Sequence, residues 1–319
     1  MTGGPGERID HAVRATPGFS GVVLAARGGK IELLRGYGYA DRARRIRNTP
    51  QTRFRVTWLA DQFTAVGLLQ LEASGRVDLD ASVCEWIPRC PAAWRGTTVD
   101  EILRYKARLA LPRHGPDDRS LAAWVAAMRG LRFQTYPKSD ARGSELVLQY
   151  VLERASGLSW ERYVRSHIWR RAHMSATGLG GPSSIGYSGD TPVPGIDATR
   201  TPSRSDGVVS TAGDFYRYLR ALADGTLLPR GQFARMVELV PGSYISGYYG
   251  VWRYGWLVSR HPQRADGHLF AGQNAHGERG WDTAIAFYPD DDAVFVVFEN
   301  RSHAPFELIQ VASDALLGG

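Results

Sequence analysis

The hydrophobic pattern of this chain changes its period twice, and that change limits the folds open to it. Near the start, two apolar, β-rich runs over residues 19–26 and 31–39 flank Arg27-Gly28-Gly29-Lys30, whose glycines supply the positive φ of a tight hairpin turn. Strand patterns return only near the end, over residues 250–259, 268–271, 283–288 and 293–299. Strand-forming sequence therefore occupies both ends of the chain.

The middle of the chain has the period of helices. From Trp58 onward, apolar residues recur at helical spacing until Ser74-Gly75, which ends this segment. Residues from about 78 to 222 predict further helical segments, broken by Pro and Gly and without a convincing hairpin. A last helix is predicted over residues 305–317.

This order of elements predicts an α/β fold of the α+β kind, with one antiparallel sheet built from both termini, flanking helices and an inserted helical lobe. At 319 residues the chain suits a single domain. We expect a sheet lobe over approximately 1–57 and 224–319, and a helical lobe over approximately 58–223. A cleft between two such lobes is a common place for a binding site.

The charge pattern argues against nucleic acid as a partner. The net charge is +7, but only three of the 39 basic residues are lysines, and the arginines are scattered over the whole length. The densest basic cluster, residues 162–173, interleaves Arg with apolar residues at helical spacing and predicts an amphipathic helix with a solvated basic face. We expect a small molecule as the partner and no nucleic acid.

Targeting, thiol and metal signals are weak. No run of eighteen apolar residues occurs, and residues 1–8 lack the apolar stretch of a signal peptide, so we expect a cytoplasmic protein without membrane contact. Cys84 and Cys90 are too few for a disulfide scaffold and are expected to be reduced. His261, His268 and His276 lack metal-ligand spacing, so we expect no metal and no cofactor.

Short segments spread over nearly the whole chain share a known pattern. They are Phe19-Ser20-Gly21-Val22-Val23-Leu24, Gly36-Tyr37-Gly38-Tyr39-Ala40-Asp41, Asn48-Thr49-Pro50 with Thr52-Arg53-Phe54-Arg55, Leu71-Glu72-Ala73-Ser74-Gly75, Glu153-Arg154-Ala155-Ser156-Gly157, Asp206-Gly207-Val208-Val209-Ser210-Thr211-Ala212 and Tyr254-Gly255-Trp256. Together they resemble the superfamily of serine β-lactamases, penicillin-binding proteins and esterases, and most closely its class C β-lactamase-like members. The resemblance implies their fold.

The sequence departs from the superfamily pattern at the position of the catalytic serine. In this superfamily a Ser at the start of a helix attacks a carbonyl carbon, and a Lys one turn later helps to remove its proton. An alignment without gaps through Phe54-Arg55 and residues 62–65 puts Trp58 at the Ser position and Asp61 at the Lys position. An indole offers no acyl acceptor, so the resemblance implies that no acyl-enzyme forms there.

The other signature segments of the superfamily are also replaced in this alignment. The Tyr-x-Asn motif corresponds to Asp140-Ala141-Arg142, and the His-Thr-Ser-Gly segment to Tyr105-Lys106-Ala107-Arg108. The motif of Lys or His followed by x-Gly falls on Asn274-Ala275-His276 or on His276-Gly277-Glu278, before Trp281.

The replacing residues include acids and bases, which suits proton transfer if they share one cleft. We expect Asp61 to act as base or charge anchor, and Lys106 with Tyr105 as proton donor or electrostatic stabiliser. His276 would pair with Asp61 or Asp140 across the cleft. Alternatively, several of these side chains point to solvent, and Asp61 is an ordinary acid in the first turn of a helix.

A second group of residues is predicted to hold the substrate. Its members are Trp58, Arg108, Lys138, Arg142, Asn274, Glu278 and Trp281. The basic members suit an anionic group such as a carboxylate, and the two indoles suit apolar walls. Alternatively, the basic members form a solvated rim, and Trp58 packs in the core.

Three functions remain open from the sequence. The first is an enzyme of specialised metabolism that performs cyclisation, isomerisation, elimination or hydrolysis on a carbonyl-containing, anionic substrate by acid–base catalysis without a covalent intermediate. The second is a non-catalytic relative that binds a ligand or a protein. The third is a serine hydrolase whose nucleophile has moved to Ser139 or Ser144.

Overall fold

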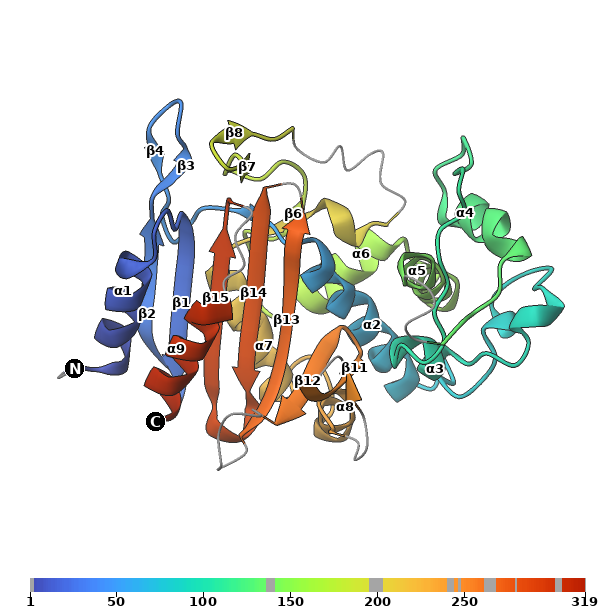
Figure 1. Cartoon of the computed structure of the whole chain (residues 1–319). Coiled ribbons are helices and arrows are strands. Elements are labelled where there is room, and N and C mark those ends of the chain that lie inside the picture. Colours follow the sequence, from blue (N-terminus) through green and yellow to red (C-terminus); the bar gives the residue numbers. More distant parts are fainter. Residues whose placement is uncertain are drawn as a thin grey trace.

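An antiparallel sheet of eight strands forms the centre of the computed structural model (Figure 1), in the order β10-β11-β12-β13-β14-β15-β1-β2. The structure describes residues 3–135, 141–194, 203–239, 244–245, 248–260, 268–278, 280–301 and 306–318. From the start of the chain come β1 (Gly21–Arg27) and β2 (Lys30–Tyr37). From its end come β10 (Tyr244–Ile245), β11 (Tyr248–Arg253), β12 (Trp256–Arg260), β13 (Leu269–Glu278), β14 (Trp281–Tyr288) and β15 (Ala293–Glu299). The predicted fold class is confirmed.

Pairing of β1 with β15 joins the two ends of the chain, with Val22 opposite Phe298 and Leu24 opposite Val296. On its other side β1 pairs with β2 through a two-residue turn, in which Gly28 and Gly29 both have positive φ. This conformation matches the twist of the paired strands and is open to glycine without strain. The predicted hairpin is confirmed.

Helices cover both faces of the sheet, so β1 and β15 are buried on both sides and read as continuous apolar runs. Alternate residues of β1 serve two cores. Val23 and Ala25 pack with α1 (Pro5–Ala15) and α9 (Phe306–Leu317), which lie side by side on the near face in Figure 1. Val22 and Leu24 face the other core, on the side of α7 (Ala212–Ala223).

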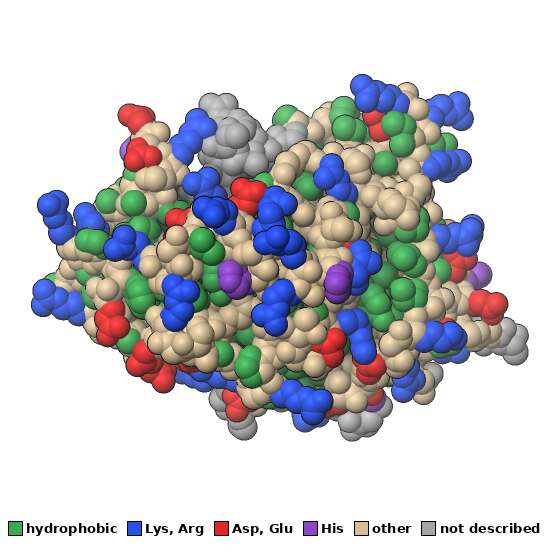
Figure 2. Space-filling model, turned by 180° about the vertical axis from the view of Figure 1, so that it is seen from behind, with side chains coloured by type: hydrophobic (Ala, Val, Ile, Leu, Met, Phe, Trp, Pro, Cys, Tyr) green, Lys and Arg blue, Asp and Glu red, His purple; other side chains and the backbone are tan. Residues whose placement is uncertain are grey.

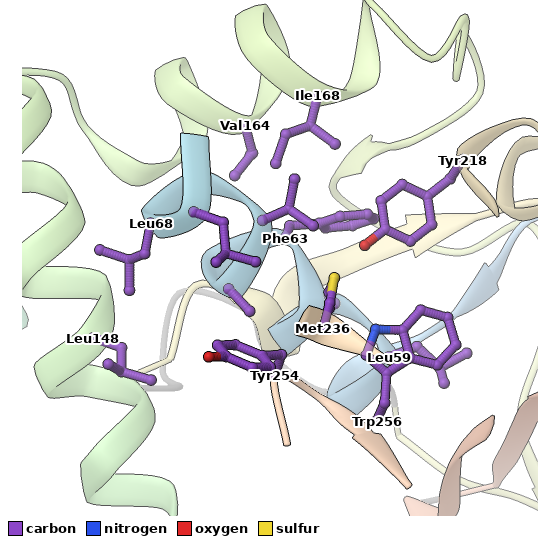
Figure 3. Close-up of a cluster of buried hydrophobic side chains, with 14 of the residues drawn as sticks. Leu59, Phe63, Leu68, Leu148, Val164, Ile168, Tyr218, Met236, Tyr254 and Trp256 are labelled. Atoms are coloured by element: carbon purple, nitrogen blue, oxygen red, sulfur yellow. The ribbon is translucent and has the colours of Figure 1, made fainter. Parts of the chain in front are cut away.

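The second core is centred on α2 (Asp61–Ala73), which is buried on nearly all sides. Around it lie α5 (Arg142–Ser156), α6 (Trp160–Val164) and α8 (Arg230–Met236). Figure 3 shows Phe63 of α2 pointing toward Tyr218 of α7, and their ring centres are 5.1 Å apart. A helix that is apolar all round is stable only inside a core. Only the first residues of α2 are therefore available to form part of a site.

Several local predictions are wrong. Residues 250–259 form a hairpin instead of one strand, because Tyr254 and Gly255 turn the chain between β11 and β12 with positive φ. Residues 78–222 contain a short hairpin, β7 (Tyr187–Ser188) with β8 (Thr191–Pro192). The helix expected from Trp58 begins only at Asp61, after the 3-10 turn η1 (Thr57–Ala60).

The predicted boundary of the helical lobe at residue 223 stays a prediction. In the structure α7 packs against β1 and β15, although it falls within the predicted helical lobe. The remaining short helices, α3 (Val99–Leu103) and α4 (Leu121–Ala127), lie beside α5, away from the sheet (Figure 1).

Cys84 and Cys90 form a disulfide, with Cα atoms 5.3 Å apart. The prediction of reduced thiols is therefore wrong. None of the helices in the described ranges has the length and apolar character that a bilayer crossing requires.

Candidate active site

The site forms where η1 meets two other segments, β13 and the 3-10 turn η6 (Ser205–Gly207). The sheet that places them is small: β5 (Phe54–Arg55), which precedes η1, pairs with β9 (Val208–Ser210), which follows η6. Two segments far apart in sequence therefore reach the start of α2 together. Thr57 takes φ 31°, which a β-branched residue rarely adopts, and such strain is often found at functional sites.

Trp58 lies on the surface of η1 with 41% of its area exposed. It is therefore not core packing. Its neighbour in the site is Asp61, the first residue of α2. The turn between β11 and β12 supports this helix start from behind, because Gln62 donates a 3.2 Å hydrogen bond to the carbonyl oxygen of Gly255. A Cβ at Gly255 would lie 2.8 Å from the Gln62 side chain, so glycine is needed there.

Asp61 accepts a 2.6 Å hydrogen bond at Oδ1 from the hydroxyl of Ser205. Burial raises the pKa of the Asp61 carboxyl to about 8, and the negative charge of Asp206 adds to this, while the Ser205 hydrogen bond opposes it. Burial therefore outweighs the helix start, which would favour the carboxylate. Such a pKa suits a group that exchanges protons near neutral pH.

Glu145 is a second carboxyl at this site, and the sequence did not reveal it. It lies on α5 and accepts hydrogen bonds at Oε1 from Thr64 at 2.6 Å and from Gln149 at 2.9 Å. Burial and the charge of Asp61 raise the pKa of Glu145 well above its usual range. Because the charge of one carboxyl raises the pKa of the other, the two titrate as a pair, and the second proton is lost at a higher pH than the first.

A chain of hydrogen bonds connects the two carboxyls. The Gln149 amide donates to Glu145 and also to Ser203, at 3.0 Å. The hydroxyls of Ser203 and Ser205 lie 2.7 Å apart, and Ser205 donates to Asp61. Since Ser205 uses its proton on Asp61, Ser203 is the donor in the bond between the two hydroxyls. The chain therefore runs in one direction, from Gln149 to Asp61, and ends on an acceptor.

Tyr105 adds a phenol close to both carboxyls. Burial and the charges of Asp61 and Glu145 raise its pKa, against the opposing charge of Arg108. Its ring lies 6.2 Å from that of Trp252 on β11, and its backbone takes φ 56°. The phenol therefore keeps its proton and can act as a hydrogen-bond donor.

The remaining predicted residues lie in different surroundings. Lys106 and Arg142 are exposed, and Arg108 is half-buried, with its backbone paired to Gln134. Trp281 is only 2% exposed and donates a 3.0 Å hydrogen bond to Ser184, so it packs in the core instead of lining an open cleft.

Other predicted residues fall outside the described part. Lys138, Ser139 and Asp140 lie outside the described residues. Asn274, His276 and Glu278 lie on β13, whose backbone runs beside η1, but their side chains are outside the described part.

Ser144 is a poor candidate for a moved nucleophile. It is 4% exposed, and its hydroxyl oxygen accepts a 2.7 Å hydrogen bond from the backbone of Leu109. Within the described ranges, no group of three or more His, Cys, Asp or Glu side chains is placed to hold a metal ion.

Comparison with known proteins places this geometry in a family. A family model described as Beta-lactamase matches residues 9–317. PbpX of Bacillus subtilis (strain 168) is 28% identical over 251 residues, which are 74% of this chain and 62% of PbpX, so the chain spans less than two thirds of that relative. Penicillin-binding protein 4* of the same organism is 24% identical over 325 residues, 89% of this chain and 68% of that protein.

A solved structure has the same fold. D-amino acid amidase from Ochrobactrum anthropi, in complex with D-phenylalanine, superposes with a TM-score of 0.78 at 20% identity, over 98% of this chain and 99% of the amidase chain. The match of the family model over nearly the whole length carries the assignment: this chain belongs to the beta-lactamase family.

Proposed function

We propose that this member of the beta-lactamase family is a small-molecule enzyme that uses acid–base catalysis, with Asp61 as the group that accepts and returns the proton. The single observation that carries the proposal is the environment of Asp61: a carboxyl with a pKa of about 8 that lies next to an exposed indole and is linked to Glu145. A base whose pKa lies near the working pH transfers protons most effectively.

The roles of the three titratable groups follow from their pKa directions. Asp61 loses its proton before Glu145, because the ionised Asp61 keeps the Glu145 proton in place. Tyr105 keeps its proton and can stabilise negative charge that develops on a substrate oxygen. The site therefore offers one base and two neutral donors once the pH exceeds the pKa of Asp61.

A covalent step on residue 58 is not part of the proposal. The gapless alignment puts Trp58 where relatives have their serine, and an indole has no hydroxyl to acylate. Its exposed ring instead suits stacking against a flat substrate group, with Trp252 and Tyr105 as further aromatic surface.

The proposed substrate contains a carbonyl group and carries a negative charge. The charge of Arg108 reaches Tyr105, so an anionic substrate group bound near both would be stabilised. The amidase that shares the fold was solved with D-phenylalanine, which combines an aromatic ring with a carboxylate. Hydrolysis is the first reaction to test, followed by isomerisation, elimination and cyclisation.

One contact favours a second candidate function. The hydroxyl of Ser205 lies 2.6 Å from Asp61, which is the distance of a nucleophile from its base. Ser205 would then attack the carbonyl carbon while Asp61 takes its proton and later returns it to the leaving group. Against this, Ser205 is 1% exposed.

The test is a turnover screen with amides and esters of D- and L-amino acids, followed by wider metabolite panels, using Asp61→Asn and the exposed Asp80→Asn as a matched control. We expect Asp61→Asn to lower kcat by a factor on the order of 100 to 10,000 and Asp80→Asn to leave it unchanged. Equal turnover in the two variants would contradict the proposal. An acyl adduct on Ser205 in the intact mass would establish the second candidate, and a ligand bound without any turnover would establish a binding protein.

A further inference from the structure

A second hollow lies away from the site around Asp61 and shares no residue with it. Its volume is about 470 Å³. It opens between the π-helical turn η5 (Arg165–Trp169), the residues after this turn and the segment that leads to β6 (Gly178–Leu179). Its lining consists of Arg165, Trp169, Arg170, His173, Met174, Ser175 and Thr177. The floor is apolar, since Trp169 and Met174 are each 2% exposed, while the rim is basic and polar.

The wide turn explains why two arginines share this rim. The Arg170 amide donates to the carbonyl oxygen of Arg165 at 3.1 Å, and the Met174 amide donates to that of Trp169 at 2.8 Å, so each bond spans five residues. In an α-helix five residues cover about 1.4 turns, which would point the two arginines to different sides. The wider turn, with about five residues per hydrogen-bonded loop, brings Arg170 to the same side as Arg165. Such turns are frequent at functional sites.

His173 completes the rim through an unusual backbone conformation. It takes φ 55°, and the Arg217 side chain donates a 2.8 Å hydrogen bond to its carbonyl oxygen. This left-handed residue ends the helix and leaves the imidazole exposed at the edge of the hollow. Non-glycine residues adopt this region infrequently, and at functional sites the strain is often part of the design.

The side-chain donors around the hollow are largely unused. Arg165 pairs with Glu161 at 2.9 Å, and its guanidinium lies 5.5 Å from the centre of the Trp169 ring. By contrast, the side chains of Arg170, His173 and Ser175 make no hydrogen bond or ion pair with any residue that the structure describes. Figure 2 shows the face opposite to that of Figure 1, where basic side chains gather around histidine near the middle.

The carboxyl next to the hollow does not compete with an anionic ligand for these donors. The carboxyl of Asp214 is fully buried, and it accepts hydrogen bonds from Thr177 and the Ala176 amide and pairs with Arg217. Its charge is therefore already balanced. The hollow thus combines a positive rim, three unused donors and an apolar floor.

We infer that this hollow is a binding site for a small phosphate ester. Arginine binds phosphate through two parallel hydrogen bonds, and a phosphate group offers three acceptor oxygens to donors from several sides. The Arg170 guanidinium, the His173 imidazole and the Ser175 hydroxyl provide such donors. The apolar floor of Trp169 and Met174 would take the organic part of the ester.

The test is calorimetric titration of the full chain with phenyl phosphate, inorganic phosphate and benzoate at constant ionic strength. We expect saturable binding of both phosphates, with phenyl phosphate the tighter because of the apolar floor, and weaker binding of benzoate. Arg170→Ala should weaken phosphate binding by about tenfold, the worth of one charged hydrogen bond. His173→Gly, which keeps the left-handed backbone, should weaken it by a similar factor.

The matched control is Arg162→Ala, which removes an exposed arginine of α6 that does not line the hollow. It should change the dissociation constant by less than about twofold, since only long-range charge is lost. An equal loss in Arg162→Ala and Arg170→Ala would overturn the inference, and so would the absence of saturable phosphate binding. Binding to vesicles of phosphatidylglycerol, but not to soluble phosphate esters, would also overturn it in favour of a lipid headgroup.

Discussion

The hydroxyl of Ser205 and the carboxylate of Asp61, 144 residues apart in sequence, lie 2.6 Å from each other. Their contact follows from the pairing of β5 with β9, which brings the segment before α2 beside η6. Because Ser205 donates its proton, the bond stabilises the ionised form of Asp61 and lowers its pKa, against the larger effect of burial. The Ser205 hydrogen bond therefore helps to determine the pH above which Asp61 can act as the proposed base.

Replacement of Ser205 should shift the pH dependence of catalysis. Asp61 must be ionised to accept a proton, so kcat/KM of the wild type should rise with pH through about 8. Ser205→Ala removes the hydrogen bond that lowers this pKa, so the rising limb should move to higher pH by about one unit, the worth of one charged hydrogen bond.

The measurement is a profile of kcat/KM against pH for both proteins on the same substrate. A shifted limb with an unchanged plateau is the expected result. Loss of turnover at every pH would instead identify Ser205 as the nucleophile, and an unshifted limb would show that Asp61 is not the titrating base.

Glu145→Gln tests which of the two carboxyls ionises first. The pKa of Glu145 is raised well above its usual range by burial and by Asp61, so Glu145 should be neutral while Asp61 is ionised. A glutamine has nearly the same shape and is also neutral, so the rising limb of the profile should stay within about 0.3 pH unit of the wild type.

Glu145→Lys is a useful contrast, because a positive charge at this place should move the limb to lower pH. If Glu145→Gln alone moves the limb to lower pH by a full unit, Glu145 is ionised in the wild type and the assigned order of proton loss is wrong.

The parts of the fold that were predictable are those with a strong local signal. The strand predicted over residues 293–299 is β15 without change, because both of its faces are buried and seven residues in succession are buried. Gly28 and Gly29 fixed the first hairpin, since two adjacent glycines are needed for its turn. At the second hairpin Tyr254 takes the same positive φ, and a tyrosine gives no such signal in a sequence.

The site was only partly predictable for a similar reason. Asp61 and Trp58 were found through the alignment of a contiguous segment. Glu145 was missed because a single acid on an amphipathic helix usually faces water, and only the packing of α5 against α2 turns it toward Thr64. A signal was available: Glu145 is spaced four and seven residues before Gln149 and Leu152, which are both buried on the inner face of α5.

The disulfide between Cys84 and Cys90 gives a third prediction. The two residues are six apart and close a short loop around the 3-10 turn Val83–Glu85. A bond that closes a loop of this size should stabilise the folded chain by about 2 kcal/mol. The purified protein should therefore show no free thiol in a titration with Ellman's reagent, and the reduced protein should unfold at a lower temperature.

The variant Cys84→Ser/Cys90→Ser is the control for this experiment. Its unfolding midpoint should match that of the reduced wild type and should not respond to reductant. Two titratable thiols in the folded, untreated protein would contradict the disulfide.

Glu299 offers a test of burial that is independent of catalysis. It is 0% exposed and lies directly across from Asp282 in the pairing of β14 with β15. Neither of its carboxyl oxygens has a hydrogen-bond partner in the part of the chain that the structure describes. Burial, together with the charge of Asp282, raises the pKa of Glu299 to about 9. Its pKa in the unfolded chain is about 4.3.

A raised pKa in the folded state means that the folded protein holds this proton more tightly than the unfolded chain. The stability from this proton is fully present below pH 4.3 and is lost at about 1.4 kcal/mol per pH unit as the pH rises toward 9. Glu299→Gln does not titrate. Its free energy of unfolding, relative to that of the wild type, should therefore increase by about 4 kcal/mol or less between pH 5 and pH 8, as measured by urea unfolding.

Thr283→Val is the matched control, because Thr283 is a buried polar residue of the neighbouring strand β14. Its hydroxyl has no hydrogen-bond partner among the described residues, but it does not titrate. Its effect on the free energy of unfolding should be the same at both pH values. If the difference between Glu299→Gln and the wild type is also independent of pH, Glu299 does not hold its proton in the folded protein, and the sheet must accommodate two ionised carboxylates across one pair of strands.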